Sequence, residues 1–89
     1  MAILSFCPEN SAIRYKLAVI NESQSAKSEA AKLYFQAGEL AIREKSNDYI
    51  YSSLTALERL SDTAYGRALY ASLLERAEAY QQQELNAGT

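Results

Sequence analysis

The chain has 89 residues, of which 48% are hydrophobic and 22% charged, and its formal net charge is −2. That composition fits one small domain and excludes a disordered chain. No histidine is present and Cys7 is the single cysteine, which excludes Ser-His-Asp, Cys-His and paired-thiol sites. We therefore expect no enzymatic activity, no metal and no cofactor. Because nucleic-acid binding usually needs an excess of basic residues, and this chain has none, we expect no nucleic-acid partner.

The first residues predict a short extended arm over positions 1–10, since Pro8 disfavours helix at the residue before it. Residues 2–7 are apolar, but they have no basic lead and are too few for a signal peptide. No segment reaches the length that crosses a bilayer, so we expect no membrane partner. Together with the lone cysteine, this predicts a cytoplasmic protein.

Residues 11–20 fit two patterns. Ser11 is a suitable cap for a helix with three apolar residues on one face, Ile13, Leu17 and Ile20. Apolar and polar residues also alternate between positions 13 and 19, as in a strand that could pair with residues 2–7. We favour the helix because a lone two-stranded ribbon is only marginally stable.

The next segment predicts a long helix from about residue 23 to residue 45, opened by a capping box of Asn21 and Gln24. Its polar residues form one narrow stripe: Glu29, Lys32, Gln36, Glu39 and Arg43. Apolar stripes lie on both sides of it, so this helix must be covered twice, as the centre of a bundle or of a dimer. Gly38 lies mid-helix at a cost of about 1 kcal/mol, which is typical where another helix approaches closely.

Two more helices complete the prediction. A turn at residues 46–48 precedes a helix over Asp48–Leu60, and Ser61 can cap a last helix over Asp62–Gln83, whose inner stripe starts at Tyr65. Residues 84–89 are expected to be a frayed tail. The chain thus predicts one all-α domain over residues 1–89, an antiparallel bundle of three to four helices. Its expected core is Leu33, Ala37, Leu40, Leu54, Leu57, Leu69 and Leu73.

Residues 34–60 resemble one tetratricopeptide repeat. Tyr34 stands at the large aromatic position of the first helix, and Ala37-Gly38 at its Leu-Gly pair. The chain departs from the family at Ala41, where a tyrosine is usual, and at Ile50, where a small alanine is usual, and no second repeat follows. The resemblance covers about a third of the chain and implies a two-helix layer with a concave, partner-binding face.

Residues 41–49 also resemble the turn of the short enterobacterial virulence regulators, the AggR-activated regulator and PerC-like group. In that group a Glu-Lys-x-Gly-Asp-Tyr-like turn precedes an apolar helix and a later aromatic-rich helix. Here Asn47 stands where that glycine would be, and the family's tryptophan and later cysteine are absent. The resemblance implies contacts with transcription factors and nucleoid proteins.

The chain is rich in tyrosine, with seven tyrosines and no tryptophan, and tyrosine is enriched at protein interfaces. With Ile50 directed inward, Tyr51 should be exposed, so we predict a partner-binding face of Tyr51, Tyr49 and Arg43. We also predict a homodimer, with an interface of Ile3, Leu4, Phe6, Phe35 and Ile42.

The predicted function is therefore a small protein-binding module, such as an adaptor, a secretion-type chaperone or an inhibitor. Two alternatives stay open at this point. One is a transcription-linked regulator that acts through protein contacts or as a DNA-binding dimer. The other is a structural subunit of an oligomer.

Overall fold

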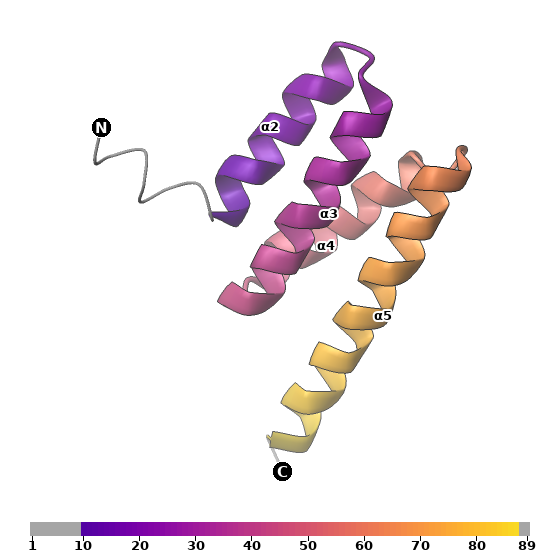
Figure 1. The fold of residues 1–89 in the computed structure, drawn as a ribbon. Coiled ribbons are helices and arrows are strands. Elements are labelled where there is room, and N and C mark those ends of the chain that lie inside the picture. Colours follow the sequence, from indigo (N-terminus) through magenta and orange to yellow (C-terminus); the bar gives the residue numbers. More distant parts are fainter. Residues whose placement is uncertain (1–9, 88–89) are drawn as a thin grey trace.

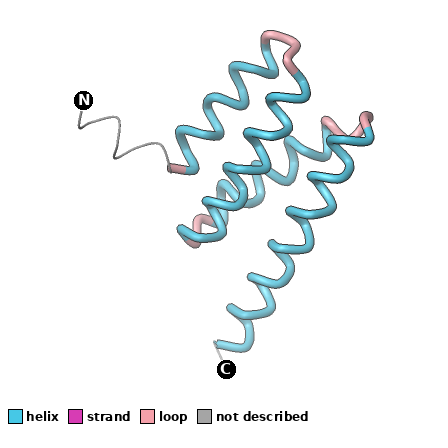
Figure 2. Tube along the Cα trace, viewed as in Figure 1, coloured by secondary structure: helices cyan, strands magenta, loops and turns pink. Residues whose placement is uncertain are grey.

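The structure, a computed structural model, describes residues 10–87, with side chains as far as Gln83, and contains four α-helices joined by short turns (Figure 1). They are α2 (Ser11–Ser23), α3 (Lys27–Glu44), α4 (Asn47–Arg59) and α5 (Ala64–Ala87). The described part of the chain contains no strand (Figure 2). The all-α prediction is confirmed, and residues 11–20 are helical. Residues 1–9 of the predicted arm lie outside the described residues.

α3 is the central helix of the bundle. It packs against α2, α4 and α5, whereas α2 otherwise touches only α4, and α5 otherwise touches only α4. Figure 1 shows α3 between α2 and α5, with α4 behind it. The two apolar stripes of α3 are thus covered within one chain.

The core is centred on α3 and α4. Its largest fully buried apolar side chains are Tyr34, Leu57 and Leu73. Four predicted core residues are buried: Ala37, Leu40, Leu57 and Leu73. The other three, Leu33, Leu54 and Leu69, are only half-buried and pack against the core from its edge. The prediction placed them too deep, since each lies at the edge of the core on its own helix, α3, α4 or α5.

At Gly38, α5 approaches α3 closely. A Cβ atom built on Gly38 would lie 2.4 Å from Cδ2 and 2.8 Å from Cδ1 of Leu73. Any side chain would overlap Leu73, which is fully buried. The close helix approach expected from a glycine at mid-helix is therefore present.

The start of α2 differs from the prediction. Its N-cap is Asn10, whose side-chain oxygen accepts hydrogen bonds from the N–H groups of Ala12 and Ile13. Ser11 is buried, and its backbone N–H and hydroxyl both donate to the carboxylate of Glu44, at 3.1 and 2.7 Å. Ser11 therefore joins α2 to the end of α3, and the residue before it supplies the cap.

The turn between α2 and α3 also corrects the prediction, because Asn21 and Gln24 do not open α3. Asn21 belongs to α2, where its side-chain amide donates to the Leu17 carbonyl, and Gln24 ends that helix. Ser25 then takes a left-handed conformation with φ of 65°, and α3 begins at Lys27. The polar residues that resembled a capping box are the C-terminal turn of the preceding helix.

The last two helices are shifted slightly from their predicted ranges. α4 begins at Asn47, one residue early, and Ser61 does not cap α5 because its hydroxyl donates to the Glu58 carbonyl. The hydroxyl of Thr63 instead accepts from the N–H of Gly66 at 3.0 Å. α5 begins at Ala64 and continues to Ala87, beyond the predicted helix end at Gln83.

Candidate functional site

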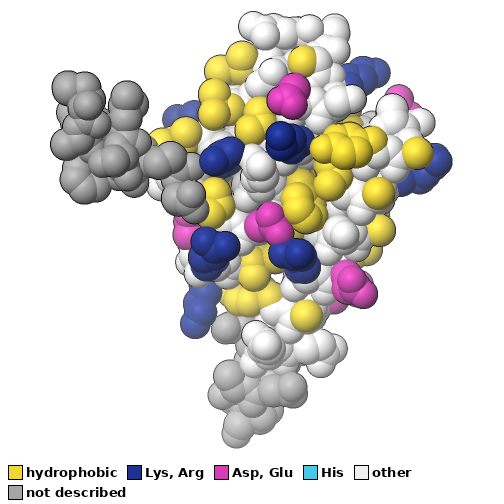
Figure 3. Space-filling view, in the orientation of Figure 1, with side chains coloured by type: hydrophobic (Ala, Val, Ile, Leu, Met, Phe, Trp, Pro, Cys, Tyr) yellow, Lys and Arg dark blue, Asp and Glu magenta, His cyan; other side chains and the backbone are white. Residues whose placement is uncertain are grey.

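The outer face of α2 carries most of the exposed apolar side chains in the described residues. The described residues include six exposed large hydrophobic side chains. Four of them belong to α2: Ile13, Leu17, Val19 and Ile20. Ile20 is 50% exposed and Leu17 43%. Figure 3 shows hydrophobic side chains along the outer edge of α2. We call Ile13, Leu17, Val19 and Ile20 the α2 face.

This face points outward because the opposite side of α2 is already committed. Ala18 is fully buried, and Tyr15 makes edge-to-face contacts with Tyr34 of α3 and Tyr49 of α4, at centroid distances of 5.3 and 5.5 Å. Ile13, Leu17 and Ile20 lie at i, i+4 and i+7, on the side away from these contacts. The sequence prediction had assigned the three to one face of the helix, and that face is the solvent-exposed one.

A hollow of about 430 Å³ lies beside the α2 face, between α2 and α4. Its lining residues are Tyr15, Lys16, Val19, Ile20 and Tyr49. Four of the five are apolar or aromatic, and Lys16 supplies the one charged group. Such a lining suits a bulky apolar side chain that is held by packing, with one charged contact at the edge.

Glu22, near the end of α2, is engaged in bonds within the chain. The Tyr34 hydroxyl donates to Oε1 of Glu22 at 2.7 Å, and Nη2 of Arg59 lies 2.8 Å from the same oxygen. Burial, with the hydrogen bond to Glu22, raises the pKa of the Tyr34 hydroxyl above its ordinary value. The hydrogen bond to Glu22 also raises the pKa of Arg59. Glu22 thus ties the end of α2 to α3 and α4.

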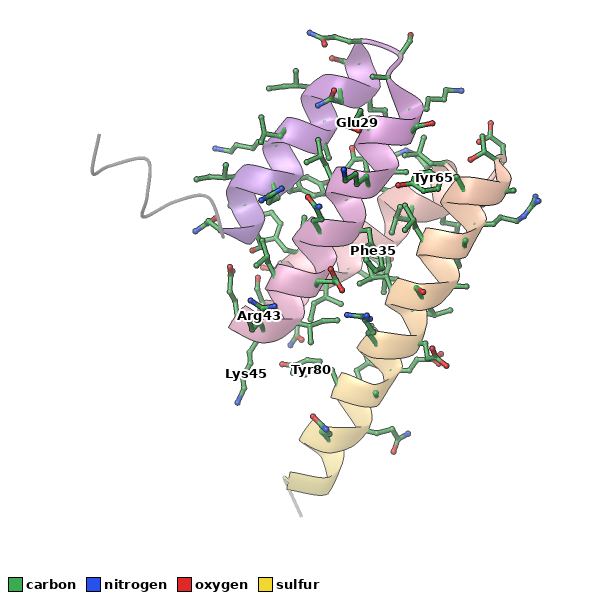
Figure 4. All side chains as sticks on the ribbon, viewed as in Figure 1. Glu29, Phe35, Arg43, Lys45, Tyr65 and Tyr80 are labelled. Atoms are coloured by element: carbon green, nitrogen blue, oxygen red, sulfur yellow. The ribbon has the colours of Figure 1, made fainter. Side chains whose placement is uncertain are left out.

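The three residues of the predicted partner-binding face do not share one hollow. Tyr51 is 74% exposed, as predicted, but lines none of the hollows described here. Tyr49 lines the α2–α4 hollow and touches Tyr15. Arg43 lies near the end of α3 (Figure 4) and lines two others. None of these three hollows brings the predicted residues together, and the partner-binding face stays a prediction.

The two hollows at Arg43 both have Glu39 in their linings. One, of about 310 Å³, is lined by Glu39, Ile42, Arg43 and Arg76. The other, of about 180 Å³, is lined by Arg14, Gln36, Glu39, Leu40 and Arg43. Arg76 of α5 pairs with Glu39 and lies over the Phe35 ring, 5.7 Å from its centroid. These contacts connect α5 to α3.

The predicted dimer residues fall into two groups. Ile3, Leu4 and Phe6 lie outside the described residues. Phe35 and Ile42 are half-buried, since both pack against the core of their own chain, and Figure 4 shows Phe35 between α3 and α5. Tyr65, placed by the sequence on the inner stripe of α5, is 46% exposed.

Among the residues that the structure describes, no group of three or more His, Cys, Asp or Glu side chains could hold a metal ion. No described helix has the length and apolar character needed to span a membrane. No protein-family model, curated protein or solved structure matches this chain.

Proposed function

We propose that this chain is a small non-enzymatic protein-binding module, working in the cytoplasm as an adaptor, a secretion-type chaperone or an inhibitor. The observation that carries the proposal is the α2 face, together with its hollow. Four aliphatic or β-branched side chains exposed on one short helix are costly in water unless another surface covers them. Tyr51, the most exposed large hydrophobic side chain among the described residues, offers a second contact elsewhere on the bundle.

Site-specific photocrosslinking tests this proposal. A benzophenone amino acid replaces Leu17 or Tyr51, and a control carries it at Ala71, an exposed position on α5. The chain is produced in its own host cells, irradiated, and analysed by mass spectrometry. We expect adducts with another protein from positions 17 or 51, suppressed by excess unmodified chain.

The masses of the adducts separate the alternatives. Adducts at multiples of 9.9 kDa alone would identify a structural oligomer and contradict the proposal. The absence of adducts at both positions, in a chain whose circular dichroism is unchanged, would also contradict it.

A further inference from the structure

The α2 face has the spacing of a helix-pairing surface. Ile13, Leu17 and Ile20 follow one another at steps of four and three residues, the spacing by which one helix presents a continuous apolar stripe to another. All three are exposed, at 37%, 43% and 50%. The opposite side of α2 packs on α3, so a partner helix could lie along the stripe without disturbing the bundle.

The hollow between α2 and α4 gives this stripe a place for one anchoring side chain. Val19 and Ile20 line the hollow on α2, together with Lys16. The rings of Tyr15 and Tyr49 also line it and contact each other, with 5.5 Å between their centroids. Because Tyr15 also touches the buried Tyr34, this wall is held in place by the core. Interface energy tends to concentrate where an apolar or aromatic residue fills such a pocket.

The charges beside the stripe are basic. Lys16 lies at the edge of the hollow and is exposed, and Arg14 lies on the other side of the stripe, where its guanidinium also donates to Gln36 at 2.6 Å. Three acidic groups of the described residues are bound within the chain. Glu22 is bound by Tyr34 and Arg59, Glu44 by Ser11, and Glu39, which lines a hollow with Arg14, by Arg76. A partner helix with acidic residues on its flanks would therefore complement the charges of this face.

We propose that the α2 face binds an amphipathic helix of another protein, whose apolar stripe lies along Ile13, Leu17 and Ile20 and whose acidic residues flank that stripe. One bulky apolar side chain of the partner fills the hollow beside Tyr49, and a carboxylate pairs with Lys16. The inference deepens the proposed function and depends on it. It adds the helical form and the acidic character of the partner.

Two other occupants fit the same face less well. A second copy, with α2 antiparallel to α2 about a two-fold axis, would bring Lys16 near the Lys16 of its mate, so that like charges meet. Binding to an anionic lipid surface grows with the number of cations on the face, and this one offers Lys16 and Arg14.

Fluorescence anisotropy with designed peptides tests the inference. The probe is a stapled helical peptide of about 15 residues, with leucines at i, i+4 and i+7 and glutamates on both flanks. The matched control peptide has lysines in place of the glutamates. We expect the glutamate peptide to bind at least about tenfold more tightly, and the preference to shrink as salt is raised.

Variants of the chain make the test specific. Lys16→Glu should reverse the preference between the two peptides, whereas Arg67→Glu, an exposed charge reversal on α5, should leave it unchanged. Ile20→Ser should weaken the glutamate peptide at least about tenfold. Tyr65→Ser, which alters a side chain of similar exposure on α5, should not. Circular dichroism of each variant verifies that the bundle is folded.

Several results would overturn the inference. They are equal affinity for the two peptides, binding that Ile20→Ser does not change, a doubled mass that Ile20→Ser abolishes, or equal binding of the chain to phosphatidylserine vesicles. If photocrosslinking at position 17 still captures another protein, such a result leaves the proposed function standing and removes only the acidic helix. The absence of crosslinks at both positions contradicts the proposed function itself.

Discussion

Replacing Gly38 by alanine tests the close contact between α3 and α5. Two effects oppose each other. Alanine favours helix over glycine by about 1 kcal/mol, but its methyl group would lie 2.4 Å from Cδ2 of Leu73, well inside van der Waals contact. Overpacking of this kind costs about 1–3 kcal/mol. Because Leu73 is fully buried and has little room to move, we expect Gly38→Ala to lower the free energy of unfolding by about 1 kcal/mol.

The sign of the effect should reverse when Leu73 is shortened. Leu73→Ala alone should cost about 2–5 kcal/mol, because it leaves a cavity at a fully buried site. In that background the overlap is gone, and Gly38→Ala should raise the free energy of unfolding by about 1 kcal/mol. Urea unfolding followed by far-ultraviolet circular dichroism gives all four corners of this double-mutant cycle. If Leu73→Ala does not fold, Leu73→Val replaces it.

A control measures the helix-propensity effect in this chain. Ala71 is exposed on α5, so Ala71→Gly should lower the free energy of unfolding by about 1 kcal/mol without any packing change. If Gly38→Ala stabilises the wild-type chain as much as it stabilises the Leu73→Ala chain, the two helices do not meet at Gly38.

Three further predictions concern pH, the exposed tyrosine and the oligomeric state. The folded state holds the pKa of Tyr34 above the ordinary 10.0. The contribution of the neutral Tyr34 hydroxyl to stability is therefore complete below about pH 10 and is lost as the pH rises above that value. Urea midpoints should fall less steeply with alkaline pH in Tyr34→Phe than in the wild-type chain, and an identical fall in both chains would contradict this. Tyr51→Ala should weaken binding to a partner identified by crosslinking while it changes the free energy of unfolding by no more than about 0.5 kcal/mol; a large loss of stability would show that Tyr51 has a structural role. The homodimer stays a prediction. Light scattering at low micromolar concentration should give twice 9.9 kDa, and a mass of 9.9 kDa would refute the dimer. If residues 1–9 form the interface, Leu17→Glu should leave the doubled mass unchanged.

Periodicity predicted the helices well because it is a local property. The double apolar stripe of α3 was enough to predict a central helix, and Gly38 to predict a close neighbour, since both follow from the geometry of one helix. Helix ends were predicted less well. Asn10 and Ser11 are both good caps by residue type, and the choice between them depends on Glu44, a residue 33 positions away that binds Ser11.

The candidate site was missed for a related reason. The sequence shows that Ile13, Leu17 and Ile20 share a face, but not which way that face points. The orientation of α2 is set by residues that look unremarkable in the sequence: Ala18, which fits closely against the core, and Glu22, which binds Tyr34 and Arg59. The exposure of Tyr51 was predicted correctly because its neighbour Ile50 is buried, and adjacent residues of a helix point in different directions.

The arrangement of the outer helices has a consequence for local opening. Within the described residues α2 and α5 share no contact, because each packs on α3 and α4 from its own side. Either helix can therefore detach while the other stays docked, and the backbone amides of α2 and α5 should exchange with deuterium in separate steps, each before those of α3. A ligand on the outer surface of α2 would then slow exchange in that helix and leave α5 unchanged.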